Sequence, residues 1–266
     1  MPTPSQARTA NLLERIVVAR RRSLEQARQA TSLSQLEERA AAAPPVRDFR
    51  AALERDAINV IAELKKASPS RGVLRAAYNP AGLAPELEAA GAAALSVLTE
   101  PEFFQGGLED LQVARQVSGL PVLRKDFLFD RYQVLEARAA GADAFLLIAA
   151  ILAEKDLQGL IQLGRELGMA ALVEVHTAEE LERALGAGAE LLGVNNRNLK
   201  TFEVRLETSL ELIERIPDDR VAVSESGLRS AEELRRLRAA GFDAFLVGEF
   251  LMQSREPAQA LARLLA

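Results

Sequence analysis

The sequence predicts a (β/α)8 barrel, an α/β fold, and the spacing of four glycines is the first observation that supports it. Gly91, Gly141, Gly188 and Gly241 each follow a helix-like stretch and precede a short apolar run, and they recur roughly every 50 residues. A glycine just past a helix C-terminus takes the left-handed conformation that other residues resist. Each of these positions therefore indicates the end of a helix and the start of a strand.

Four further strands complete the set of eight, and they are predicted at 58–63, 120–127, 169–175 and 220–226. They are continuous apolar runs, as expected for strands that are covered on both faces. Between the strands, Thr177 with Glu180 and Ser230 with Glu233 have capping-box spacing, which indicates helices. Eight evenly spaced strand–helix units favour closure into a barrel. An open, doubly wound sheet is the alternative.

Residues 1–45 lie outside this repeat and are predicted to form an N-terminal helical extension. Leu12, Leu13 and Ile16 have the spacing of an amphipathic helix, and the prolines in the segment AAAPPV (41–46) end it. We expect the extension to pack on the barrel, which would occupy residues 46–266. The two parts would then form a single domain.

The composition excludes several classes of protein. The 266 residues carry a net charge of -5, which argues against a sequence-independent nucleic-acid binder. The absence of cysteine excludes disulfides and thiolate sites. Met1–Gln6 lacks the layout of a signal peptide, and the longest apolar run, 144–153, is about half of what a bilayer requires. We therefore expect a cytoplasmic protein with no membrane or nucleic-acid partner. As a separate expectation, it would be a monomer.

Polar residues follow seven of the eight predicted strands, and only the strand at 144–152 has none. A single case would mean that a strand has reached the surface, but a surface explanation would scatter such residues over both ends of the barrel. Active sites of these barrels lie at the C-terminal ends of the strands. We therefore expect a reaction site there. In strand order the residues are Glu63 and Lys65; Thr99 and Glu100; Lys125 and Asp126; Glu174; Asn195 and Arg197; Glu225, Ser226 and Gly227; Gly248 and Glu249.

The charges at these ends point to an anionic ligand. Lys65, Lys125 and Arg197 are cations in an acidic protein, and they would attract an anion. Ser226-Gly227 and Gly248 follow the seventh and eighth strands, where many barrels bind phosphate through backbone N–H groups. A simple turn requirement is the other explanation for these glycines.

Loop aromatics and a lone histidine complete the inventory. Phe103, Phe104 and Phe127 follow the second and third strands, where they would pack in the core or sandwich a flat ring. His176 is the only histidine, and it offers too few partners for a metal site together with Glu174 and Glu63. We expect no metal and no cofactor, and we assign His176 no role.

Seven motifs in order resemble those of the indole-3-glycerol-phosphate synthase family. The resemblance runs from about residue 11 to the end of the chain, and the motifs follow successive strands. They are ELKKASPSRG, VLTEPEFFQGG, VLRKDF, LVEVH, GVNNRNL, VSESGL and FLVGEFLM. The family's enzymes act in tryptophan biosynthesis, where they close and decarboxylate 1-(2-carboxyphenylamino)-1-deoxyribulose 5-phosphate.

The resemblance implies a role for each matching position. Lys125 would be the general acid and Glu174 its acid/base partner, with Glu63, Lys65 and Asn195 in the same catalytic group. The residues implied to bind the phosphorylated substrate are Ser68, Phe104, Phe127, Arg197, Ser226, Gly227, Gly248 and Glu249. At position 249 a carboxylate cannot face a phosphate, so only the backbone N–H would contribute. We expect the partly desolvated mouth to lower the pKa of Lys125.

Two other functions stay open at this point. A Schiff-base aldolase with the same barrel would use Lys125 as a nucleophile. A catalytically silent barrel would bind a phosphosugar and act as a partner or sensor. Neither explains the paired glutamates and lysines as well, and the fold alone does not decide between them.

Overall fold

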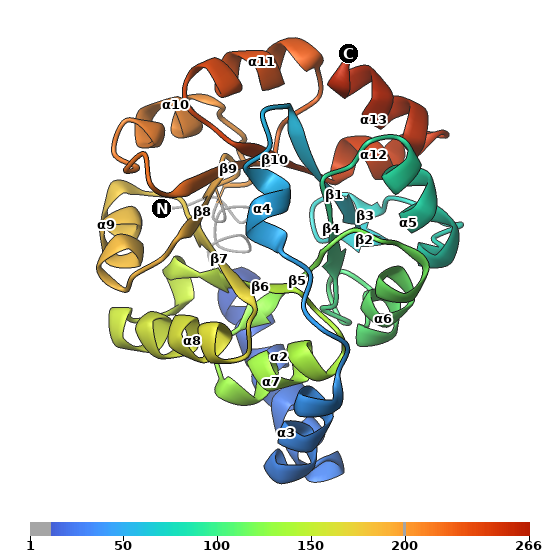
Figure 1. Cartoon of the computed structure of the whole chain (residues 1–266), viewed down its shortest axis with the longest axis vertical. Coiled ribbons are helices and arrows are strands. Elements are labelled where there is room, and N and C mark those ends of the chain that lie inside the picture. The colour runs from blue at the N-terminus through green and yellow to red at the C-terminus, as the bar shows by residue number, and fades with distance from the viewer. Residues whose placement is uncertain (1–11, 199–200) are drawn as a thin grey trace, which may run out of the picture.

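The computed structural model describes residues 12–198 and 201–266, so that the Met1–Gln6 segment considered above lies outside it. Eight parallel strands form a closed barrel, which confirms closure over the open sheet (Figure 1). Around the barrel the order is β1-β10-β9-β8-β7-β6-β5-β4, so consecutive barrel strands are paired, and the first and last strands, β1 and β10, pair to close the barrel. The strands are β1 (Asn59–Leu64), β4 (Ala94–Leu98), β5 (Val122–Leu128), β6 (Ala144–Ile148), β7 (Ala170–Val175), β8 (Leu191–Asn195), β9 (Val221–Glu225) and β10 (Ala244–Val247).

Helices surround the strands, and the four repeated glycines end helices as predicted. Gly91, Gly141, Gly188 and Gly241 have φ values of 97°, 88°, 84° and 116°, in the left-handed region. The helices are α5 (Pro80–Ala89), α6 (Leu108–Val117), α7 (Arg131–Ala139), α8 (Glu154–Glu166), α9 (Ala178–Gly186), α10 (Glu207–Ile213), α11 (Ala231–Ala239), α12 (Glu249–Gln253) and α13 (Pro257–Leu265).

The two predicted capping boxes differ in the structure. Ser230 and Glu233 form a complete box at the start of α11. At α9, the Thr177 hydroxyl accepts the Glu180 N–H, but the Glu180 carboxylate accepts the backbone N–H of His176 instead of that of Thr177. At α9 only half of the predicted capping box is therefore formed.

Two short elements depart from the predicted pattern. The strand predicted at 144–152 ends at Ile148, and the apolar run continues as the 3₁₀ helix η1 (Ala149–Ile151). An unbroken apolar run does not distinguish a strand from a helical turn, so the prediction of its end was wrong. In addition, β2 (Ala67–Ser68) and β3 (Gly72–Val73) form an antiparallel hairpin directly after β1.

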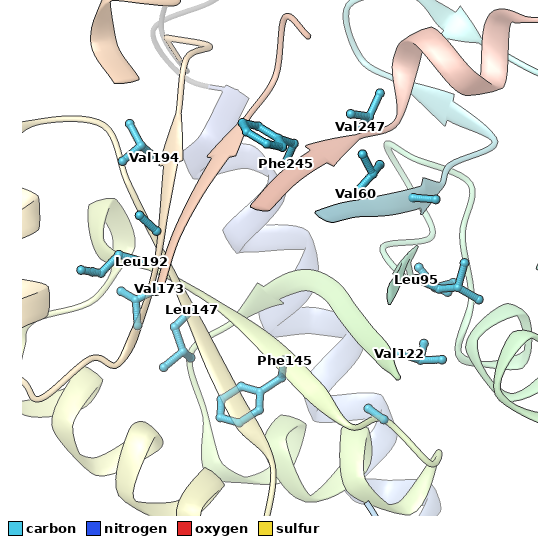
Figure 2. Packing of buried hydrophobic residues seen from close by; sticks show 14 of the residues in the cluster. Val60, Leu95, Val122, Phe145, Leu147, Val173, Leu192, Val194, Phe245 and Val247 are labelled. Atoms are coloured by element: carbon cyan, nitrogen blue, oxygen red, sulfur yellow. The ribbon is translucent and has the colours of Figure 1, made fainter. Parts of the chain in front are cut away.

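Both faces of the barrel strands are buried, which explains their continuous apolar sequence. Val60 and Ala62 of β1 belong to a large cluster between strands and helices, part of which Figure 2 shows. Ile61, between them, belongs to a second cluster together with inward residues such as Leu123 and Leu172. Successive side chains of a strand therefore fill two separate cores.

The N-terminal segments cover the two ends of the barrel. Phe49 and Leu53 of α4 (Phe49–Leu53) join the inner cluster, and Figure 1 shows this helix over the centre of the barrel. At the other end lies α2 (Leu12–Ala30), followed by α3 (Leu33–Ala42), which packs on α7 through Leu36 and Tyr132. The division into an extension of 1–45 and a barrel of 46–266 stays a prediction. Within the described ranges no helix is long and apolar enough to span a membrane.

Candidate active site

A cavity of about 380 Å³ opens at the C-terminal ends of the strands, beneath the start of α2. Leu12, Leu13 and Ile16 of α2 form part of its wall, so the N-terminal helix contributes to the mouth of the barrel. All the residues to which the resemblance gives a role line this one cavity, whereas Thr99 and Glu100, which were also predicted at the strand ends, do not. They are Glu63, Lys65, Ser68, Phe104, Lys125, Phe127, Glu174, Asn195, Arg197, Ser226, Gly227, Gly248 and Glu249.

A buried lysine–carboxylate cluster forms the floor of the cavity. The Nζ of Lys125 lies 2.7 Å from Glu174 Oε2 and 3.2 Å from Glu225 Oε2. These residues come from β5, β7 and β9, the third, fifth and seventh strands of the barrel, and β1 contributes Glu63. Inward side chains of alternate strands form one layer in such barrels. In this protein that layer contains one ammonium and three carboxylates.

The end of β5 that carries Lys125 is irregular and is held by Asp126. The pairing of β5 with β6 shifts register between Arg124 and Leu128. The buried Asp126 accepts hydrogen bonds from Thr99 Oγ1 (2.7 Å), Arg124 (3.0 Å) and Arg20 of α2 (2.9 Å). Thr99 and Asp126, which were predicted at the mouth, therefore fix the end of this strand.

The pKa of Lys125 shifts in the direction opposite to the expected one. Burial alone would lower it, but the carboxylates of Glu174, Glu225 and Glu63 outweigh burial and raise it. The expected lowering was wrong because it considered desolvation without the surrounding negative charges. Lys125 is therefore held as an ammonium.

The two carboxylates on Lys125 have very different proton affinities. Burial raises the pKa of Glu225 to about 7, and the nearby Glu174 adds to this rise against the effect of Lys125. For Glu174 burial also favours the neutral form, but Lys125, then His176 and Asn195, outweigh it and lower the pKa to about 2. One carboxylate therefore stays ionised while the other exchanges its proton near neutral pH.

Two residues of this cluster received no role from the sequence. Glu225 was identified at a strand end, and its Oε1 is buried without a hydrogen-bond partner in the described part of the chain. His176 Nε2 lies 3.5 Å from Glu174 Oε1. The signal for His176 was its i, i+2 spacing from Glu174, which places both side chains on the same side of the chain.

Cations and their partners surround the opening of the cavity. Lys65 forms an ion pair with Glu63. Arg197 lies 3.1 Å from one carboxylate oxygen of Glu249, and Arg71 of the β2–β3 hairpin lies 3.3 Å from the other. The Arg197 N–H also donates to Asn195 Oδ1 at 3.0 Å. Glu249 therefore connects three loops through its side chain, and Arg71 is a cation that the sequence analysis did not include.

The glycines at the mouth have steric explanations. A Cβ on Gly248 would lie 1.9 Å from Glu63 Oε2, and one on Gly193 would lie 2.2 Å from Glu225 Oε1. At Gly227 (φ 84°) a Cβ would lie 2.4 Å from a Val204 methyl group. Ser226 also has a positive φ of 68°, which is uncommon for a residue with a side chain and frequent at functional sites.

The aromatic residues form one wall of the cavity. The rings of Phe104 and Phe127 contact each other with centroids 6.0 Å apart and an interplanar angle of 37°. In this arrangement they do not sandwich a ring between them. Phe103 lies elsewhere, beneath the guanidinium of Arg15.

The geometry defines a class of protein before any comparison with relatives. A (β/α)8 barrel with a buried cluster of proton donors and acceptors, below a rim of cations, is typical of an enzyme that performs acid–base chemistry on an anionic substrate. The family model for indole-3-glycerol phosphate synthase matches residues 13–264. The chain belongs to this family, which consists of carboxy-lyases of tryptophan biosynthesis.

Individual relatives agree with this assignment. The chain is 50% identical over 261 residues to indole-3-glycerol phosphate synthase of Dechloromonas aromatica, covering 97% of this chain and 100% of the relative. It is 49% identical to the enzyme of that name from Chromobacterium violaceum, covering 96% and 98%. The fold is similar to that of 3-hexulose-6-phosphate synthase from Salmonella typhimurium, with a TM-score of 0.61, 13% identity, and 78% and 98% of the two chains covered.

Proposed function

We propose that this chain converts 1-(2-carboxyphenylamino)-1-deoxyribulose 5-phosphate into indole-3-glycerol phosphate by ring closure, decarboxylation and dehydration. The observation that carries the proposal is Lys125, held as an ammonium between the ionised Glu174 and the protonatable Glu225. The reaction requires proton donors and acceptors and no redox step. Membership of the family supports the same substrate.

The charges of the cavity suit this substrate. Its phosphate carries about -1.5 to -2 charges near neutral pH, and it bears a carboxylate as well. In our proposal the phosphate binds at Ser226, Gly227 and Gly248, where position 249 adds only its backbone N–H. Ser68, Lys65 and Arg197 bind the remaining polar groups, and the aromatic ring packs on the wall formed by Phe104 and Phe127.

Lys125 acts in the first step of the proposed mechanism. The aromatic carbon that bears the carboxylate attacks the ketone carbon, and the electron pair of the C=O bond moves to oxygen. The ammonium of Lys125 stabilises this negative charge and gives its proton to the oxygen, which becomes a hydroxyl group. The substrate carboxylate then leaves as carbon dioxide, and its bonding electrons restore the aromatic ring.

The two carboxylates with separated pKa values suit the dehydration step. Glu225, with a pKa of about 7, gives a proton to the leaving hydroxyl group. Glu174, which is ionised, accepts the proton that the new ring loses. Two carboxyl groups whose environments separate their pKa values are a recurring way to assign an acid and a base. Glu63 holds Lys65 through their ion pair. Asn195 holds the ionised Glu174 through a side-chain hydrogen bond.

The aldolase alternative is less compatible with the site. A Schiff base requires a neutral amine as the nucleophile, whereas the carboxylates around Lys125 raise its pKa and keep it protonated. A silent binding protein would require no protonatable carboxyl group such as Glu225 in the floor of the cavity. Neither alternative has an observation of its own in the structure.

A turnover assay with 1-(2-carboxyphenylamino)-1-deoxyribulose 5-phosphate, followed by the absorbance of the indole product, tests the proposal. We expect turnover by the wild type, and a nearly inactive Lys125→Met variant that still binds the substrate. Lys65→Met should weaken binding more, because that ammonium pairs with anions. Binding without turnover would favour the silent barrel. An adduct on Lys125 after addition of borohydride would establish the aldolase.

We also propose that the enzyme acts as a monomer in the cytoplasm. All the proposed site residues come from one chain and line one cavity, so that the site requires no second copy. The cytoplasmic location is expected for an enzyme of amino-acid biosynthesis. Sedimentation of the active enzyme would test the first statement, and fractionation of the cells that produce it would test the second.

A further inference from the structure

His176 lies directly behind the proposed catalytic base. It follows the last residue of β7, two positions after Glu174, and its side chain is only 12% exposed. Its Nε2 lies 3.5 Å from Glu174 Oε1, while Lys125 occupies the other oxygen, Oε2, at 2.7 Å. Each oxygen of Glu174 therefore has its own positively charged or protonatable neighbour.

A second carboxylate lies within ion-pair distance of the imidazole on its opposite side. His176 Nδ1 lies 3.4 Å from Glu180 Oε2, and the same oxygen accepts the backbone N–H of His176 at 2.7 Å. Glu180 belongs to the first turn of α9, where its own N–H donates to the Thr177 hydroxyl. The carboxylate that the sequence pattern assigned to a complete capping box therefore accepts the backbone N–H of His176 and lies within ion-pair distance of its ring.

The electrostatic surroundings favour the charged imidazolium. Burial alone would lower the pKa of His176, but Glu180, Glu174 and Glu225 outweigh burial and raise it. These three carboxylates come from α9, β7 and β9, and Lys125 is the nearby cation on the far side of Glu174. Because two carboxylates lie within ion-pair distance, the imidazolium is matched by opposite charge on both of its nitrogens.

We propose that His176, held beside Glu180, is a positioning residue. It would hold Oε1 of Glu174, the carboxylate oxygen that Lys125 does not contact. The catalytic part of this inference rests on the proposed function. When Lys125 gives its proton to the substrate, it loses its charge and Glu174 loses a cation. His176 keeps a cation beside Glu174 at that moment, so that the carboxylate stays in place for the next proton transfer.

The first test measures the imidazole without any turnover. His176 is the only histidine of the 266 residues, so its ring gives a single set of NMR signals. In the full-length protein we expect its pKa to lie above the ordinary value of about 6.5. Both Glu180→Gln and Glu174→Gln should lower it. Glu182→Gln is the matched control, because that side chain on the same helix is 72% exposed and should leave the titration unchanged. A pKa at or below 6.5 that neither variant shifts would overturn the inference.

The second test separates positioning from a structural role. His176→Gln should lower kcat roughly tenfold or more, since a small displacement of a catalytic group is costly, and should leave KM within about twofold. Glu180→Gln should show a weaker version of the same change, and Glu182→Gln should show none. In the wild type, kcat should fall as the pH rises through the NMR-measured pKa of His176. His176→Gln should lose this step of the pH profile and keep only the fall that follows the deprotonation of Glu225.

The outcomes distinguish this inference from the proposed function. If the wild type does not turn over the substrate, the proposed function fails, while the NMR coupling of His176 to Glu174 can still be observed. If the wild type is active but both His176→Gln and Glu180→Gln keep its kcat and its pH profile, His176 is only structural and the inference is overturned. If His176→Gln does not fold, Glu180→Gln and the wild-type pH profile decide.

Discussion

The two ends of the barrel both contain buried polar side chains, but these side chains have different partners. At the end closed by α4, Asp143 precedes β6 and accepts the backbone N–H groups of Arg47 (2.7 Å) and Val122 (2.8 Å), one on each oxygen. Asp243 precedes β10 and accepts the N–H of Ala222 at 2.8 Å. These carboxylates connect neighbouring segments of the backbone.

At the open end the three carboxylates in the floor of the cavity have side-chain partners alone, although Glu100 and Asp126 nearby accept backbone N–H groups. In the described residues no backbone N–H donates to Glu63, Glu174 or Glu225, and Glu225 Oε1 has no hydrogen-bond partner. A buried polar group without its full set of hydrogen bonds is unfavourable for folding. The comparison therefore separates polar groups that stabilise the chain from polar groups that are left available for a substrate.

The largest expected effect on the open end follows from Glu174→Gln. The neutral amide cannot accept a proton, so we expect kcat to fall by roughly 10²- to 10⁴-fold. Substrate binding should change little, whereas stability at neutral pH should fall, because the lowered pKa of Glu174 shows that its ionised form is stabilised by Lys125 in the folded protein. Steady-state kinetics, calorimetric binding and denaturant unfolding measure these effects. A variant with a near wild-type kcat would show that Glu174 is structural, and the contrast between the ends would then be lost.

Glu225→Gln should reduce activity and increase stability together. We expect a fall in kcat of about 10²-fold, because the amide cannot give a proton to the leaving group. The folded-state pKa of Glu225, about 7, lies above the ordinary glutamate value of 4.5, so its contribution to stability is lost as the pH rises from 4.5 through 7. The Gln variant should therefore be more stable at pH 8, by at most about 3 kcal/mol.

The pH dependence provides the control for Glu225→Gln. The gain in stability should shrink toward pH 5, where the wild-type carboxyl group is protonated in the folded protein. Denaturant unfolding at several pH values measures it. A variant that is less stable than the wild type at pH 8 would mean that the contact with Lys125 outweighs the burial of the charge.

The barrel and the convergence of the site residues were predictable from the sequence because both depend on chain-local signals. A glycine marks the end of a helix, and a polar residue after an apolar run marks the end of a strand, whatever the rest of the chain does. Contrary to what the sequence pattern had indicated, buried polar residues are not confined to the open end, since Asp143 and Asp243 are buried at the other end. The ends differ in the partners of these residues, and the partners come from distant segments.

Proton affinities and ring orientations were not predictable for the same reason. The pKa of Lys125 depends on carboxylates from three other strands. Glu174, the nearest of them in sequence, is 49 residues away. The role of His176 depends on where the Glu180 carboxylate lies, since it accepts the backbone N–H of His176 and approaches the ring. Gly193 appears as an ordinary glycine in the sequence, and Gly248 was predicted only as part of a phosphate site. The packed barrel shows that carboxylates occupy the space of their missing side chains.

A third prediction concerns the closed end of the barrel. Asp143→Ala should lower the free energy of unfolding by roughly 2–4 kcal/mol, because two buried backbone N–H groups lose their acceptor. The kcat at a temperature where the variant is folded should stay within about twofold of the wild type. Asp56→Ala is the matched control, since that side chain is fully exposed and should change neither quantity. A large loss of kcat in folded Asp143→Ala would contradict the division between the two ends.

The smallest expected effect sharpens the comparison at a single strand. In Gly193→Ala the new methyl group would lie 2.2 Å from Glu225 Oε1, so the flexible carboxylate should move and lose its contact with Lys125. We expect kcat to fall about tenfold, with a change in unfolding free energy of less than about 1 kcal/mol, since a side chain that can move relieves most of the overlap. Gly164→Ala is the counterpart on the outside of the barrel. Its methyl group would lie 2.6 Å from the buried ring of Phe145, which cannot yield as easily.

Gly164→Ala should therefore cost about 1–3 kcal/mol of stability and leave kcat unchanged. A double variant completes the test, because Glu225→Asp shortens the side chain and withdraws the carboxylate from position 193. The effect of Gly193→Ala on kcat should then be much smaller in the Glu225→Asp background than in the wild type, as expected for two residues in contact. If the two effects are instead independent, Gly193 acts on turnover by another route, and the carboxylate is not what requires a glycine at that position.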